Sequence, residues 1–171
     1  MLKIIGSVFI LLATTWAGFD AAKRLAERTK QLRQLKVSLQ SLEAEIMYGH
    51  APLKDASEHI AKQTASPLSD LFISFSQKLS DGDTDVKRAW EESLSEIWPS
   101  TSLKEGELEI LRQFGETLGQ HDLITQQKHI RLTMAHLEKE EKEAVDHQVR
   151  YEKMMKSLGF LVGLLIIILL M

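Results

Sequence analysis

The chain has 171 residues, of which 44% are hydrophobic and 26% are charged, a composition typical of one folded domain and not of a disordered chain. Its net charge of −3 gives no general reason to expect nucleic-acid binding. The absence of cysteine excludes a disulfide scaffold, a thiol nucleophile and a thiolate zinc site.

Apolar residues are concentrated at the two ends of the chain. Residues 4–19 carry no charge, and residues 158–171 contain no polar side chain. A membrane-spanning helix needs about 20 mainly apolar residues, and a slightly shorter stretch can span where the bilayer thins locally. We therefore predict membrane-spanning helices over residues 1–19 and 154–171. The alternative for the first stretch is a cleavable signal peptide, although Thr15-Trp16-Ala17 is a poor cleavage site.

Basic residues beside both apolar stretches predict the orientation of the chain. Lysines and arginines outnumber acidic residues just after the first stretch and also gather before the second; they are Lys23, Arg24, Arg28, Lys30, Arg33 and Lys36, and then Lys139, Lys142, Arg150, Lys153 and Lys156. By the positive-inside rule, residues 20–153 lie in the cytoplasm and both termini lie on the opposite side of the cell membrane. The alternative is an exported domain with a C-terminal anchor. The cations of the first group, from Lys23 to Lys36, also predict contact with anionic membrane lipid.

Residues 20–153 show helical periodicity and no convincing alternating β pattern. A first helix is expected over residues 20–50, because apolar residues recur on one face; they are Leu25, Leu32, Leu35, Leu39, Leu42 and Ile46. Gly49 is expected to end it in the left-handed conformation. A second helix is expected from Pro52 to about Ala65, and a third begins at Ser66-Pro67 and ends before the turn at residues 81–83.

Capping residues and helix breakers divide the rest of the region. A fourth helix is expected to begin after Thr84 and to end before Pro99. A fifth is expected to begin with a capping box formed by Ser102 and Glu105 and to close at Gly119.

Asp122 is expected to cap a sixth helix, which lacks a strong breaker and runs straight into the second apolar stretch. The predicted fold class is therefore all-α, a six-helix antiparallel bundle over residues 20–153 flanked by N- and C-terminal transmembrane helices. Trp90 and Trp98 are expected to pack in its core and not to stack on a ligand.

No arrangement of residues favours an enzyme or a metal centre. His129 and His136 lie about two helical turns apart, which is too far to chelate one ion well, and no nucleophile motif or phosphate-binding glycine loop occurs. Glu105, Glu107 and Glu109 are interpreted as helix-start acids favoured by the macrodipole. We therefore expect no catalytic residue, no cofactor, no metal and no nucleic-acid partner.

Three short motifs carry a more specific signal. Pro52-Leu53 lies between Gly49 and Ala56 in the first, Gly82 follows Leu79 in the second, and Gly115-Glu116 precedes Gly119 in the third. The order and spacing of these motifs, from about Leu32 to the C-terminus, resemble those of the type II secretion F-type inner-membrane platform domain. The candidate family-motif residues are Gly49, Pro52, Leu53, Ala56, Gly82, Gly115, Glu116 and Gly119.

Elementary stereochemistry gives these residues structural interpretations as well. Gly49, Gly115 and Gly119 are interpreted first as positions of special backbone geometry or of close approach between helices. Glu116 lies in an apolar part of its helix, and we expect it to reach either backbone N–H groups of a neighbouring loop or a partner. The structural role is favoured.

The resemblance implies an F-type helical fold, self-association and contact with a secretion-type ATPase. Members of this family usually carry two copies of the domain and three spans, whereas this chain has one copy and a span in front of it. A single copy between two spans is similar to the members of the family that act in endospore formation, in a channel complex joining mother cell and forespore. One departure is Gln120-His121 after Gly119, where the family has a small residue followed by leucine.

We therefore expect a non-enzymatic platform that couples a cytoplasmic secretion-type ATPase to other membrane components of this complex, with homo-oligomer formation. The alternative is a membrane-anchored sensory or ligand-binding helical bundle. A membrane-bound hydrolase has no residue-level support.

Overall fold

A computed structural model describes the backbone of residues 2–80, 85–119 and 122–170, and the side chains from Asp20 to Met154 within those ranges, apart from positions 21 and 152. All the regular secondary structure in these ranges is helical, which confirms the predicted all-α class. The predicted turn at residues 81–83 and the predicted cap Thr84 lie outside the described residues.

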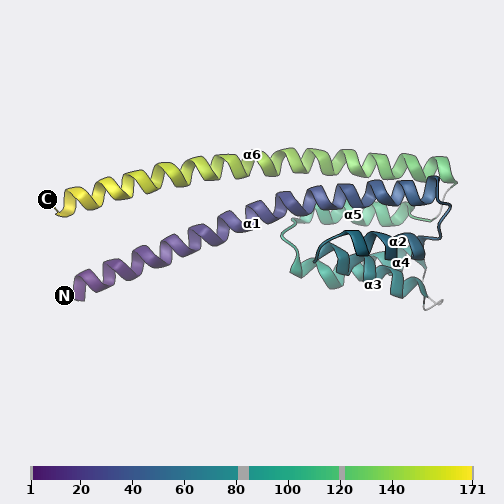
Figure 1. Cartoon of the computed structure of the whole chain (residues 1–171), viewed down its shortest axis with the longest axis horizontal. Helices are drawn as coiled ribbons and strands as arrows, with labels where there is room; N and C mark the ends of the chain where they lie inside the picture. Colours follow the sequence, from purple (N-terminus) through teal and green to yellow (C-terminus); the bar gives the residue numbers. More distant parts are fainter. Residues whose placement is uncertain (1, 81–84, 120–121, 171) are drawn as a thin grey trace.

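Two long helices determine the shape of the molecule. Helix α1 (Leu2–Met47) and helix α6 (Leu123–Leu170) are each continuous, and at 1.5 Å per residue each is about 70 Å long. The chain runs away from the N-terminus along α1 and returns along α6, so both termini lie at the same end (Figure 1). The prediction that the sixth helix continues without interruption into the C-terminal apolar stretch is confirmed.

Four shorter helices and one turn of 3₁₀ helix form a lobe against one side of this pair, away from the termini (Figure 1). The lobe comprises α2 (Leu53–Gln63), α3 (Leu68–Ser80), α4 (Val86–Ile97), η1 (Trp98–Ser100) and α5 (Glu105–Thr117). Successive helices of the lobe pack against one another, and α2 and α5 also pack against α1 and α6 respectively.

The core is built from the stripes that the sequence predicted. Five of the six apolar positions of the first predicted helix are buried, and Leu25, nearest the N-terminus, is half-buried. Trp90 of α4 is fully buried at the centre of the lobe, with its ring centroid 5.0 Å from that of Phe75 and 5.5 Å from that of Phe114. Its indole N–H donates to the Leu111 carbonyl at 2.8 Å, so the polar atom of this large side chain is satisfied. The expectation that Trp90 serves the core is confirmed.

The predicted end of the first helix is wrong in its details. Residue His50, not Gly49, has the left-handed conformation, with φ of +47°. Gly49 is required for a different reason, because a Cβ atom there would lie 2.8 Å from the backbone oxygen of Glu45. The turn after α1 folds back on the last helical carbonyls, and only a residue without a side chain fits against them.

The fifth helix begins two residues later than the predicted capping box would place its start. Lys104 is the N-cap residue, and its backbone N–H donates to Glu107 Oε2 at 2.6 Å. The Ser102 backbone N–H is used elsewhere, donating to Gln31 Oε1 of α1 at 2.8 Å. A long-range contact to α1 therefore displaced the local capping pattern. The predicted cap of the sixth helix is confirmed, because Asp122 Oδ2 accepts from the Thr125 N–H at 3.3 Å.

Within the part of the chain that the structure describes, none of the helices combines the length and the apolar character that a membrane crossing requires. Nearly all side chains of the two predicted spans, residues 1–19 and 154–171, lie outside the described set, so these spans stay predictions.

Candidate functional site

The first motif forms the turn between α1 and α2. Pro52 is the N-cap residue of α2 with φ of −55°, the value that the proline ring imposes, and Leu53 begins the helix. Ala56 is fully buried one turn later. This motif therefore fixes the direction in which the chain enters the lobe.

The third motif meets the first in space. Gly119 has φ of +75°, a conformation that glycine adopts at little cost, and a Cβ atom there would lie 3.3 Å from Leu53 Cδ1. Its N–H donates to Gln126 Oε1 at 3.1 Å, which connects the turn to α6. The prediction that Gly119 is a position of special backbone geometry is confirmed, and this residue lies against the first residue of α2.

Gly115 and Glu116 have separate surroundings. A Cβ atom on Gly115 would lie 2.3 Å from Trp90 Cδ1, so α4 and α5 approach each other too closely for any side chain at this position. Glu116 is more than half exposed, and its Oε1 lies 3.2 Å from Lys87 Nζ. Glu116 was expected to reach backbone N–H groups of a neighbouring loop or a partner, whereas the contact that the structure gives it is to a lysine of α4. Gly82, the remaining motif residue, lies outside the described residues.

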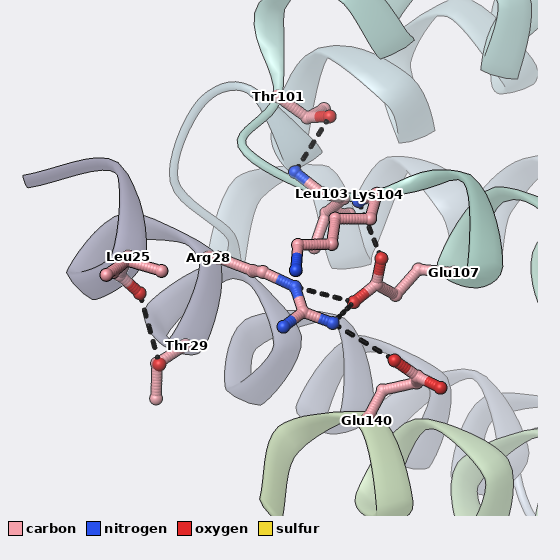
Figure 2. Close-up of polar contacts among 8 residues, drawn as sticks. All are labelled: Leu25, Arg28, Thr29, Thr101, Leu103, Lys104, Glu107 and Glu140. Atoms are coloured by element: carbon pink, nitrogen blue, oxygen red, sulfur yellow. Dashed lines mark hydrogen bonds and ion pairs between the residues drawn. The ribbon is translucent and has the colours of Figure 1, made fainter. Parts of the chain in front are cut away.

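A buried polar cluster connects three helices at the end of the lobe nearest the termini. The Arg28 guanidinium of α1 lies between Glu107 of α5 and Glu140 of α6 (Figure 2). Arg28 Nε is 2.8 Å from Glu107 Oε1, Arg28 Nη2 contacts the same oxygen, and Arg28 Nη2 is 3.0 Å from Glu140 Oε2. The side chains of Arg28 and Glu107 are 4% and 0% exposed, whereas Glu140 is 22% exposed.

Glu107 uses its two oxygens for two purposes. Oε1 accepts from Arg28, and Oε2 accepts from the Lys104 N–H that begins α5 (Figure 2). A buried carboxylate is tolerated only when it is paired and hydrogen-bonded, and Glu107 meets both conditions. The cluster therefore fixes the start of α5 against the long helices.

The sequence did not lead us to expect this cluster, because we interpreted Glu107 only as a helix-start acid favoured by the macrodipole. A signal was present, since Glu107 has the same helical spacing as the buried residues Leu111, Phe114 and Leu118. Arg28 falls on the buried face of α1 in the same way, three residues after Leu25 and four before Leu32. Opposite charges on two buried faces are the pattern that predicts such a pair.

A second, more exposed set of charges joins α1 to α6. Glu141 accepts from Arg33 Nε at 2.7 Å and from Lys36 Nζ at 3.0 Å. Partial burial raises the pKa of the Glu141 carboxyl, but the hydrogen bonds and charges of Arg33 and Lys36 outweigh it, so the net pKa lies below the usual value. Glu43 joins the same two helices near the end of α1 and the start of α6, where it accepts from Gln127 Nε2 at 2.7 Å and from Arg131 Nε at 2.8 Å.

The Glu141 pair predicts an acid-dependent loss of stability. Because the folded state lowers the pKa of Glu141, its contribution is fully present above about pH 4.5, the ordinary value, and is lost as the pH falls through the folded pKa. We expect Glu141→Gln to destabilise the chain at pH 7 by on the order of 1 kcal/mol and less at pH 3. Urea denaturation of both proteins at the two pH values measures this, and an equal difference at pH 7 and pH 3 would contradict it.

The arrangement does not resemble a metal centre. Among the residues that the structure describes, no group of three or more histidine or acidic side chains is placed to hold a metal ion. His136 is exposed on α6, and His59 contacts Glu45 through its Nδ1 at 3.3 Å.

A family model described as Stage III sporulation protein AB matches residues 3–171. A Bacillus subtilis (strain 168) protein named Stage III sporulation protein AB is 59% identical over 171 residues, covering 100% of both chains. A solved structure of a protein of the same name has a TM-score of 0.70 and 56% identity, covering 72% of this chain and 98% of its own. The helical fold described above therefore has a solved counterpart over most of the chain.

Proposed function

The chain belongs to the stage III sporulation protein AB family and has a role in sporulation, and from this premise we propose that it is a non-enzymatic platform in the cell membrane. On this proposal residues 1–19 and 154–171 span the membrane, and residues 20–153 lie in the mother-cell cytoplasm. There the lobe couples a secretion-type ATPase to the other membrane components of a type II secretion-like channel between mother cell and forespore.

The observation that carries the proposal is the continuity of the two long helices. Both α1 and α6 run without interruption from the packed lobe to chain ends that lie at the same end of the molecule (Figure 1). Two apolar ends that leave a domain in the same direction can enter one bilayer from one side. The cations beside both apolar stretches support the cytoplasmic placement of the lobe.

Topology and partner capture test the proposal together. A reporter fused after residue 171 is expected to be active only on the outer side of the membrane, and external protease should leave residues 20–153 intact. Cross-linking and pull-down from sporulating cells is expected to recover a secretion-type ATPase and further copies of the chain. A reporter active only inside, or external cleavage of most of the chain, would overturn the proposal.

The lobe with the adjoining parts of α1 and α6 is expected to fold without the apolar ends. Among the side chains that the structure describes, the buried apolar ones lie between Leu32 and Ala144, so a fragment of residues 20–153 keeps all of them. We expect this fragment to be soluble and to give a strongly helical far-UV circular dichroism spectrum; a spectrum without helix would contradict the prediction. The same fragment serves to test the alternative of a ligand-binding bundle, because a platform is not expected to gain thermal stability from small ligands or metal ions.

Glu116 provides the sharpest test of the partner surface. Its side chain is exposed and pairs with Lys87, so Glu116→Ala is expected to cost at most about 1 kcal/mol of stability. We expect it to leave membrane insertion intact and to reduce recovery of partners in the pull-down. Glu109→Ala is the matched control, because Glu109 is also exposed and lies two turns earlier on the same helix. Equal recovery with wild type and Glu116→Ala would argue against a partner contact there.

A further inference from the structure

The Arg28 cluster lies where a relative movement of α1 and α6 would act on the lobe. Arg28 is the point at which one side chain of α1 contacts both α6 and the start of α5. From this level α1 and α6 continue toward the chain ends without a break. A change in the spacing or tilt of the two long helices therefore reaches the lobe first at this cluster.

The hydrogen bonds of the cluster determine how a change in the spacing or tilt of α1 and α6 would affect α5. Hydrogen bonds of 2.8 and 3.0 Å weaken steeply when the atoms separate by more than about half an ångström. Glu107 is also held by the Lys104 N–H of its own helix, whereas Glu140 is partly open to water. When α1 moves relative to α6, Arg28 therefore either leaves Glu140 or displaces the start of α5.

A second contact ties the same part of the lobe to α1. The Ser102 N–H donates to Gln31 Oε1 at 2.8 Å, and the Gln31 side chain follows Arg28 by about one turn of α1. Gln31 contacts the segment that connects α4 to α5, residues 98–104. Arg28 contacts Glu107, in the first turn of α5 that follows this segment. Three residues of this segment, Pro99, Ser100 and Lys104, are exposed. A partner that binds the lobe here would therefore contact the segment directly.

We propose that Arg28 is a coupling residue: through Glu107 and Glu140 it transmits a change in the relative tilt of α1 and α6 to residues 98–107. A guanidinium suits this task because its planar fork of donors binds two carboxylates at once, which a lysine ammonium does less well. A buried ion pair often adds little stability over apolar residues of the same size, so stability alone does not account for charges at this position. The inference rests on the proposed function, since it requires both chain ends to lie in a bilayer.

The test uses the full chain reconstituted into lipid vesicles of two acyl-chain lengths, because bilayer thickness changes the tilt of spanning helices. Hydrogen exchange of the backbone N–H groups of residues 98–107 is measured in both. In wild type we expect the exchange rates to differ by about tenfold between the two bilayers, which is the effect of losing one hydrogen bond to a charged group. Residues 68–80 of α3 should exchange equally in both.

Three variants separate coupling from stability. Arg28→Met combined with Glu107→Leu replaces the pair by apolar side chains, and we expect it to fold, as judged by circular dichroism, but to exchange equally in both bilayers. Arg28→Lys keeps the charge and is expected to reduce the difference. Arg33→Met is the control, because the Arg33 ion pair joins α1 to Glu141 of α6 and not to α5. We expect this variant to keep the wild-type difference in exchange rate between the two bilayers.

The outcomes distinguish the two proposals. Extraction of the chain from vesicles by alkaline carbonate would overturn the proposed function and the coupling with it. An inserted wild-type chain that exchanges equally in both bilayers would overturn the coupling alone. A double variant that keeps the wild-type difference would do the same, because the transmission would then not pass through Arg28.

Discussion

Replacing Glu107 by alanine is expected to lower the free energy of unfolding by about 3–5 kcal/mol, the cost of leaving a buried charge without its partner. The Arg28 guanidinium would stay buried after this change, and Glu140 alone would remain to pair with it. The Lys104 N–H would also lose its acceptor at the start of α5. Urea denaturation of residues 20–153, followed by circular dichroism, measures the loss.

Two controls show whether the loss comes from an unpaired buried charge. Arg28→Met with Glu107→Leu removes both charges together and is expected to cost only about 1–2 kcal/mol, mainly through the lost cap. Arg33→Ala breaks a more exposed ion pair between α1 and α6, and its expected cost is at most about 1 kcal/mol. If Glu107→Ala costs no more than Arg33→Ala, the substitution does not leave an unpaired charge buried at Arg28.

Much of the fold could be predicted from the sequence because the signals are local. The stripe from Leu32 to Ile46 and the breaker Pro99 act within a few residues of the features they determine. The same holds for Asp122, whose carboxylate caps its own helix. A helix is a local structure, so its existence, type and approximate ends follow from patterns of this kind.

The candidate site could be predicted only in part, because its contacts join distant parts of the chain. Arg28 and Glu107 are 79 residues apart, and no single-helix pattern relates them. The start of the fifth helix was misplaced for the same reason, because Ser102 binds Gln31 and not its own helix. His50 has the left-handed conformation that was expected of Gly49. Gly49 is needed instead because a Cβ atom there would lie too close to the backbone oxygen of Glu45. Tertiary contacts override local preference at each of these positions.

Gly115→Ala is expected to destabilise the lobe by about 1–3 kcal/mol, although alanine is the better helix former. The added Cβ atom would lie 2.3 Å from Trp90 Cδ1, and Trp90 cannot move freely because Phe72, Phe75 and Phe114 surround it. The α4 and α5 helices must therefore separate, which also strains the hydrogen bond from the Trp90 indole to Leu111. Urea denaturation measures the loss, and a red shift of tryptophan emission would report increased exposure of Trp90.

Gly106→Ala is the matched control on the same helix. An added Cβ atom there would have Glu140 Oε1 at 4.0 Å as its nearest neighbour, an ordinary contact. This substitution is expected to be neutral or to stabilise by up to about 1 kcal/mol, because it reduces the freedom of the unfolded chain and improves helix propensity. The difference between the two glycines measures the close approach of α4 and α5. If both substitutions have the same effect, helix propensity and not packing against Trp90 determines the response at Gly115.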